Sequence, residues 1–376
     1  MQCFWSSASG RSPTFLKSDH TENTEHTPAR ESRSAPPPTV AGQAKIDYEI
    51  IRTVEVMINL EQMNYLVLSK HHLTEMSRID DIVRIAQDTL GLHATIPTTP
   101  YLSLYARSTT FKRSSLDIEL YLRRTFGRIR CVRRTIYILP KDLICPAFAA
   151  TEKMVTIDSD RHRQYVGVSE NEYEGLSRHI LEMVRGTGMT ARQLRVELAT
   201  TLNISAVLNL MCDQGLLVRG EPEYGWRSNL HKYYAFREYF PTLDLKQFSE
   251  EAARALVVDR YVASFGPVTR DDVAWWTGFP KRQVGRMVEQ MGGRVTEVEI
   301  SGLGPGYYAA LSDKIPLSSL TQHHEQVVNL LPALDPYLMG YKNRDRYLGE
   351  EHRDMVFDRS GNVTSTILVD GKVVGV

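Results

Sequence analysis

The feature that most constrains the fold is a pattern of secondary structure that occurs twice in the middle of the chain. In each copy a long helix, predicted over 172–185 and 249–265, is followed by a glycine-containing turn, a short helix, a third helix and a β hairpin. Thr190 and Thr269 open the short helices, and the polar residue three positions later completes a capping box. A helix-turn-helix followed by a hairpin is a winged helix, so the pattern predicts two of them in tandem.

The segment before these two copies has the same outline and predicts a third winged helix. Ser77 and Asp80 are expected to form a capping box, apolar residues follow at helical spacing, and Gly91 suits the left-handed position that ends a helix. A second helix is expected over 116–124. The run IRCVRRTIYIL, at 129–139, is rich in β-branched residues and predicts one strand with a basic face.

The two ends of the chain differ from the repeated units. Near the C-terminus, strand-like runs separated by RSGN and VDGK predict hairpins, and the last run reaches Val376 in mid-pattern, so a small, incomplete β-barrel-like module is expected. The first residues are rich in Ser, Thr and Pro and too poor in apolar side chains to form a core. We therefore expect an α+β protein with a disordered tail (1–44), three winged helices (45–168, 169–247 and 248–322) and the β module (323–376).

Composition limits the classes of function. The chain has 45 Lys and Arg against 45 Asp and Glu, so any site for a polyanion must be a local patch. No apolar run approaches the roughly 18 residues of a membrane span, and the N-terminus has no apolar signal-peptide core, so no membrane partner and a cytoplasmic location are expected. The four cysteines are scattered without a C-x-x-C pair, which indicates free thiols.

One local patch is strongly basic and favours nucleic acid. Between 107 and 134 only Asp117 and Glu119 oppose nine basic residues: Arg107, Lys112, Arg113, Arg123, Arg124, Arg128, Arg130, Arg133 and Arg134. Contacts of such residues with phosphates give affinity that does not depend on sequence. Two alternatives stay open: a solvated face with intramolecular ion pairs, and a scaffold that binds proteins.

Other candidate sites are weaker. The pairs His71-His72 and His323-His324 lack a matching carboxylate or cysteine, so no metal site is expected. The glycine-rich run at 302–308 lacks the Lys-Ser/Thr of a phosphate loop and is interpreted as a hairpin turn. Trp275 and Trp276 are interpreted as core residues.

Several longer segments carry a resemblance to a known family. They are LGLHATIPTTPYLSLYAR, VRRTIYIL, FGPVTRDDVAWWTG, LLPALDPYLMGYKNRDRYL and VDGKVVG. The chain resembles the AlkZ-like family of bacterial winged-helix DNA glycosylases over about 46–376. The resemblance implies three tandem winged helices and a C-terminal β-barrel that together bind duplex DNA. It also implies excision of alkylated purines, including N7 adducts and in some cases interstrand crosslinks, by a monomer with no metal or cofactor.

The resemblance also points to catalytic residues. The family motif is Gln-apolar-Gln or Gln-apolar-Asp, and His93-Ala94-Thr95 stands in its place. By this match His93 orients or activates the attacking water, and the hydroxyl of Thr95 orients it. The alternative is that His93 only caps the carbonyls of the preceding helix. The family strand Arg-Gly-Thr-apolar-His is also altered, because Tyr137 replaces its histidine.

The DNA contacts are expected from two basic segments. The YKNRDR segment matches the basic segment of the family, and the patch described above supplies the rest. The expected contacts are Arg107, Lys112, Arg113, Arg133, Arg134, Lys342, Arg344 and Arg346. Asp335 is expected to be a structural hydrogen-bonding residue. A nucleoid-associated enzyme is expected, and the alternative is a winged-helix transcription regulator or damage sensor without catalysis.

Overall fold

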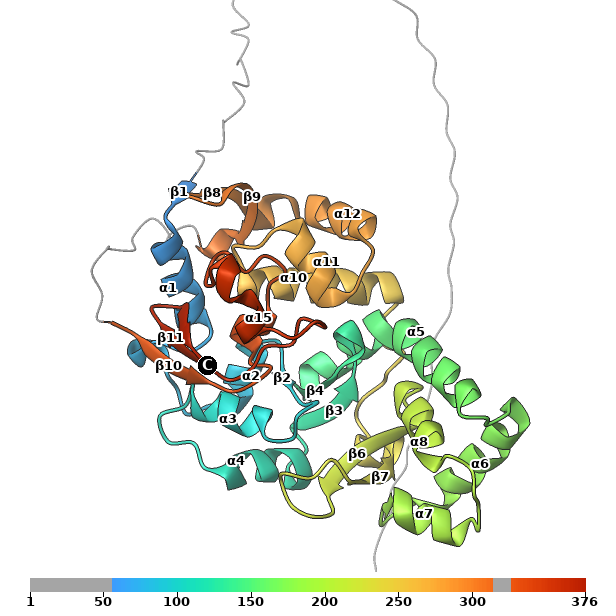
Figure 1. The fold of residues 1–376 in the computed structure, drawn as a ribbon. Coiled ribbons are helices and arrows are strands. Elements are labelled where there is room, and N and C mark those ends of the chain that lie inside the picture. Colours follow the sequence, from blue (N-terminus) through green and yellow to red (C-terminus); the bar gives the residue numbers. More distant parts are fainter. Residues whose placement is uncertain (1–55, 314–325) are drawn as a thin grey trace, which may run out of the picture. The chain divides into compact units, whose positions relative to one another are not determined.

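The computed structural model describes residues 56–313 and 326–376, which belong to one compact unit, Thr53–Val376 (Figure 1). The predicted tail and the His323-His324 pair lie outside the described residues. Within the described ranges, helices alternate with four three-stranded sheets, which confirms the α+β class.

The first part of the chain surrounds an antiparallel sheet with the order β2-β4-β3. The predicted Ser77–Asp80 capping box is wrong, because α2 begins at Ile82 and the Asp81 carboxylate accepts the amides of Val83 and Arg84 at 3.0 Å. The helix expected over 116–124 begins at Arg113, and its second half is a π-helix. The elements are α1 (Leu60–Lys70), η1 (Glu75–Ser77), α2 (Ile82–Asp88), β2 (Leu92–His93), α3 (Thr99–Tyr105), α4 (Arg113–Asp117) and η2 (Ile118–Leu122).

The single strand expected over 129–139 is a hairpin instead. Its strands β3 (Phe126–Arg130) and β4 (Ile136–Pro140) pair antiparallel around the short turn η3 (Val132–Arg134). Arg133 and Arg134 have left-handed φ angles of 53° and 58°, which reverse the chain. The run has β-branched residues on both sides of the turn and no Gly or Asn within it, so the sequence pattern did not distinguish two strands from one.

The long helix α5 (Lys141–Tyr165), which the sequence patterns did not predict, leads into the second sheet, β5-β7-β6. The predicted capping box at Thr190 is confirmed: its hydroxyl accepts the amide of Gln193, and the Gln193 side chain accepts the amide of Thr190. The elements are α6 (Glu170–Met183), β5 (Met189–Thr190), α7 (Ala191–Glu197), α8 (Ile204–Asp213), β6 (Leu217–Pro222), β7 (His231–Ala235) and α9 (Phe236–Tyr239).

The third region repeats this order, and the capping box of Thr269 with Asp272 is also confirmed. Its sheet gains a strand from the start of the described chain, because β1 (Val56–Ile58) pairs parallel with β8. The glycine-rich run forms the hairpin turn that was expected, between β8 and β9. The elements are α10 (Glu250–Phe265), α11 (Arg270–Thr277), α12 (Lys281–Met291), η4 (Gly292–Arg294), β8 (Val295–Ile300), β9 (Gly304–Ala310) and η5 (Leu311–Asp313).

The C-terminal part forms an antiparallel sheet with the order β10-β11-β12. In the described part of the chain this sheet is open, with β10 and β12 at its edges. No helix among the described residues is both long enough and apolar enough to cross a membrane. The elements are β10 (Val328–Leu331), α14 (Pro336–Met339), η6 (Glu350–His352), α15 (Arg353–Val356), β11 (Thr366–Val369) and β12 (Lys372–Gly375).

A core of aromatic side chains joins the third region to the C-terminal segment. Tyr261 stacks on Phe265 with ring centroids 5.0 Å apart, and its hydroxyl donates to the carbonyl of Gly340 at 2.6 Å. Trp276 packs beside both rings, which confirms its assignment to the core, whereas Trp275 is only half-buried.

A buried ion pair joins the first region to the C-terminal segment. The Arg107 guanidinium donates to both carboxylate oxygens of Asp335, at 2.8 and 2.7 Å, and both side chains are fully buried. Ser103 and the amide of Tyr337 also donate to this carboxylate. Asp335 is thus structural, as expected. Arg107 is not available to DNA, and its assignment as a DNA contact is corrected here.

Removing one partner of this pair leaves an uncompensated charge in the interior. We expect Asp335→Ala to lower the free energy of unfolding by about 3–5 kcal/mol, and the double variant Arg107→Met, Asp335→Leu to recover most of the loss. Denaturant unfolding followed by circular dichroism measures both. A loss below about 1 kcal/mol in Asp335→Ala would show that the pair does not hold the two segments together.

Candidate active site around His93

The strand β2 fixes the position of His93. Leu92 pairs with Ile138 and His93 with Tyr137, so the imidazole is held against β4 and is only 2% exposed. Gly91, with a φ of 91°, takes the chain from α2 directly into β2. A Cβ at this glycine would lie 2.4 Å from Leu139, so the close approach of helix and sheet requires glycine.

His93 does not cap the preceding helix. Its Nδ1 accepts the amide of Thr95 at a long 3.5 Å, whereas the carbonyls of Ala86 and Ile85 accept the amides of Gly91 and Thr89. Accepting at Nδ1 favours the tautomer with the proton on Nε2. This Nε2 is buried and has no hydrogen-bond partner among the described residues. A buried donor without a partner costs about 1–3 kcal/mol, and such exceptions call for a functional explanation.

Burial keeps the His93 imidazole neutral. Removal from water and, to a smaller extent, the positive charge of Arg133 together lower its pKa from 6.5 to about 3. A neutral imidazole would not repel the positive charge that develops on a deoxyribose when its glycosidic bond breaks. Thr95, two residues later, is exposed and lies at the start of the loop before α3.

The β hairpin beside this histidine contacts two segments that are distant in the sequence. The rings of His93 and Tyr137 have centroids 5.1 Å apart. On the turn before Tyr137, the guanidinium carbon of Arg133 lies 3.9 Å from the ring centroid of Trp275 on α11. The guanidinium carbon of Arg344 lies 5.8 Å from the same centroid. The β hairpin, α11 and the C-terminal segment therefore meet at Trp275, and the hairpin is the part of this cluster that pairs with the His93 strand.

Arg344 lies in a wall of this region. Its guanidinium carbon is 3.4 Å from the ring centroid of Phe357, and it donates to the carbonyl of Gly361 at 2.9 Å. Gly361 has a φ of 80°, and a Cβ there would lie 3.0 Å from the arginine. Arg344 also lines a groove of about 830 Å³ together with Arg270, Lys342 and Arg353, among other residues.

The structure separates the expected DNA contacts into buried and exposed residues. Arg346 is 3% exposed, donates to the carbonyl of Pro267 at 2.9 Å and stacks on Tyr341. Like Arg107, it is inaccessible to a phosphate, and its assignment as a DNA contact is corrected. Burial inside the aromatic core is the physical reason.

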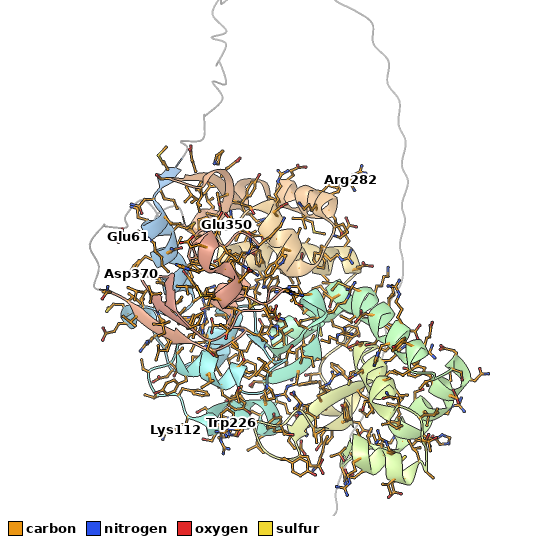
Figure 2. The ribbon with its side chains drawn as sticks, in the orientation of Figure 1. Glu61, Lys112, Trp226, Arg282, Glu350 and Asp370 are labelled. Carbon is orange, nitrogen blue, oxygen red and sulfur yellow. The ribbon has the colours of Figure 1, made fainter. Side chains whose placement is uncertain are left out.

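The remaining contacts lie at the surface or close to it. Lys112, Arg113, Arg134 and Lys342 are exposed, Arg133 is half-buried and Arg344 is buried. Arg113 lies 3.8 Å from Asp117, Arg134 lies 3.8 Å from Asp158, and Lys342 pairs with Asp271 at 2.7 Å. Figure 2 shows Lys112 near Trp226, far from Arg282 on α12. Arg113, Arg134 and Lys342 thus each have a carboxylate close by.

Ion pairs within the chain neutralise much of the basic patch, which agrees with the alternative of a solvated face with intramolecular ion pairs. Arg123 pairs with Glu119 at 2.5 Å, and Arg130 pairs with Asp213 at 2.9 Å. Arg128 is buried against His231.

The sequence patterns missed Trp275 and Phe357 as neighbours of this site. The pair Trp275-Trp276 on a short helix was a usable signal, because adjacent residues on a helix point in different directions and only one of them faces the core. Phe357 carried no such signal. No group of three or more possible metal ligands occurs among the described residues.

Comparison with known proteins identifies the family. The model of the family "DNA glycosylase AlkZ-like" matches residues 86–376, most of the chain. The chain belongs to the AlkZ-like DNA glycosylase family. An interstrand DNA cross-link repair glycosylase of Streptomyces sahachiroi is 27% identical over 138 residues, which span 34% of this chain and 34% of that protein. The match thus spans about a third of that relative.

A solved structure agrees with the AlkZ-like fold. The Streptomyces sahachiroi DNA glycosylase AlkZ superposes with a TM-score of 0.68, covers 85% of this chain and 87% of its own, and is 19% identical in sequence. At this identity the likeness shows the fold alone.

The neutral state of His93 can be tested directly. Because its folded pKa of about 3 lies below the unfolded value of 6.5, the unfolded chain takes up a proton first as the pH falls. The contribution of His93 to stability is therefore complete above pH 6.5 and decreases as the pH falls toward 3. We expect its imidazole NMR signals not to titrate between pH 5 and 8. Between pH 7 and 5 the free energy of unfolding should fall less in His93→Gln than in the parent, and the difference between the two decreases should be up to about 2 kcal/mol. A titration midpoint near 6.5 would show that the ring is not desolvated.

Proposed function

We propose that this chain is a DNA glycosylase that hydrolyses the N-glycosidic bond of N7-alkylated purines in duplex DNA, with His93 as the residue that orients water. The observation that carries the proposal is the buried Nε2 of His93, which has no partner among the described residues. By the sequence resemblance, His93 stands where the family has the first Gln of its motif. Membership in the AlkZ-like family supports the class of reaction.

The chemistry needs little from the protein. An N7-alkylated purine is a cationic leaving group, so it departs with the electrons of the C1′–N9 bond and becomes neutral. Water then forms the new bond to C1′ and releases a proton to solvent. A neutral His93 orients this water through Nε2, because Nδ1 is already occupied by the amide of Thr95. The role is therefore orientation rather than general-base catalysis, and the exposed Thr95 hydroxyl contacts the same water.

The finer architecture belongs to this proposal. We infer that the segments 45–168, 169–247 and 248–322 act as three winged helices and that 323–376 acts as a β-barrel-like wall. The exposed cations Lys112, Arg113, Arg134 and Lys342 contact the backbone of duplex DNA, and the chain acts as a monomer. All four side chains are exposed, as contacts with a DNA backbone require.

One observation favours a second candidate, a DNA-binding protein without catalysis. Thr95 offers no negative charge opposite the developing sugar cation, and Tyr137 replaces the histidine of the family strand. A damage sensor would bind the same duplex and release no base.

Base release separates the two candidates. A duplex with one N7-methylguanine, incubated with the protein and then cleaved at abasic sites, is expected to give product. His93→Ala should lower the single-turnover rate by about 10²-fold or more, and Thr95→Ala by less, because the hydroxyl is exposed. Tyr105→Ala, an exposed residue at the end of α3, is the matched control and should keep the parent rate. Binding without abasic sites would favour the sensor.

A further inference from the structure

We infer that Arg133, Trp275 and Arg344 form a binding site for one backbone phosphate of the DNA strand that runs past the His93 turn. The inference rests on the proposed function, since it names the group that the same region binds, and we call these three residues the arginine stack.

The arginine stack is built from three separate segments of the chain. Arg133 lies on the turn of the β3–β4 hairpin, Trp275 on α11, and Arg344 in the loop after α14. The guanidinium of Arg133 stacks on the indole, with its carbon 3.9 Å from the ring centroid. The guanidinium carbon of Arg344 lies 5.8 Å from the same centroid and stacks on Phe357 at 3.4 Å. Stacking on an aromatic face holds a guanidinium in place and leaves its N–H edge free to donate.

The charges of the stack are not neutralised within the protein. Among the described residues no carboxylate lies within ion-pair distance of Arg133 or Arg344, and no hydrogen bond of the Arg133 guanidinium is formed. Arg344 is 7% exposed, but unlike Arg346 it lines the groove. Its Nη2 donates to the carbonyl of Gly361, and its buried Nε has no partner among the described residues. Asp358 acts on Arg133 at longer range, but its carboxylate accepts the amides of Ser360 and Asn362.

Burial of two like charges costs free energy that an anion would recover. Desolvation lowers the pKa of both guanidiniums, and the charge of Arg133 lowers the pKa of Arg344 further. Some buried arginines of this chain bind a carboxylate, as Arg107 binds Asp335 and Arg163 binds Glu170. Arg128, Arg219 and Arg346 donate instead to neutral groups. Arg133 has neither kind of partner among the described residues, so its charge is available to an external anion.

The groove beside the stack favours a phosphodiester over a small free anion. The groove is lined by four basic residues, Arg270, Lys342, Arg344 and Arg353, and by two acidic ones, Asp271 and Asp345, so basic residues outnumber acidic ones along it. A polyanion follows such a line of cations, whereas inorganic phosphate would occupy only one point. The planar N–H edge of arginine also matches two phosphate oxygens.

The test measures binding to an undamaged duplex as a function of salt. Each phosphate contact contributes about 0.9 to the slope of log affinity against log salt. We expect Arg133→Gln and Arg344→Gln each to lower this slope by about 0.9 and the affinity by about tenfold. Because both arginines bind one phosphate, the double variant should lose no more than about 0.9. A loss of about 1.8 would overturn a single shared phosphate.

Removing the charge of single phosphates in the DNA gives a second, independent test. A neutral methylphosphonate, moved one position at a time along a duplex that carries one N7-methylguanine, should weaken binding of the parent protein at one position next to that base. The double variant should be insensitive at that position. If parent and double variant respond alike at every position, the site is overturned.

Controls separate a binding role from a structural one. Arg123→Gln removes an exposed arginine that Glu119 already neutralises, and should leave the slope unchanged. Trp275→Leu removes no charge but should lower the slope as Arg133→Gln does, because the indole positions both guanidiniums. Arg133→Gln should keep or raise the thermal midpoint, since it relieves desolvation. A lower midpoint with an unchanged slope would overturn the inference.

The readout is independent of base release. If the parent shows the expected salt dependence but forms no abasic sites, the glycosylase proposal is wrong and the phosphate site is still supported. If the double variant forms abasic sites and its salt dependence equals that of the parent, the phosphate site is wrong and the glycosylase proposal is still supported.

Discussion

The candidate site depends on the buried ion pair between Arg107 and Asp335. This pair joins residues 228 positions apart, and Ser103 and the Tyr337 amide complete the coordination of the carboxylate. Arg107 follows α3, the helix after the His93 turn, and Asp335 caps α14, which precedes the segment with Arg344. An ion pair without access to water needs further hydrogen bonds to offset desolvation, and here both carboxylate oxygens of Asp335 are satisfied, whereas the Nε of Arg107 has no partner among the described residues. It therefore fixes the C-terminal segment against the first region.

Within this arrangement, the local backbone structure sets the positions of the candidate catalytic side chains. The glycine after α2 allows β2 to form at once, and the pairing of β2 with β4 sets His93 opposite Tyr137. The left-handed turn at Arg133 then directs its guanidinium to Trp275. The result is a neutral, desolvated imidazole next to positive charges that lack internal partners. Uncompensated polar groups of this kind reduce stability, and they are typical of sites that bind a ligand.

Features that depend on residues close together in the chain could be predicted from the sequence. The capping boxes at Thr190 and Thr269 depend on residues three positions apart, and both were predicted correctly. The α+β class and the structural role of Asp335 were also correct. The assignments of Arg107 and Arg346 failed because burial depends on partners that are remote in the chain. The hairpin around Arg133 failed because strained non-glycine turns leave no mark in composition.

The central claim is that a neutral His93 orients water for base release, and the pH dependence of the chemical step tests it most directly. The measurement is the single-turnover rate of base release from an N7-methylguanine duplex between pH 5 and 8, corrected for spontaneous depurination. With a His93 pKa of about 3, the account predicts a rate that is constant over this range. A rate that falls on the acid side with a midpoint near the ordinary histidine pKa of about 6.5 would contradict it.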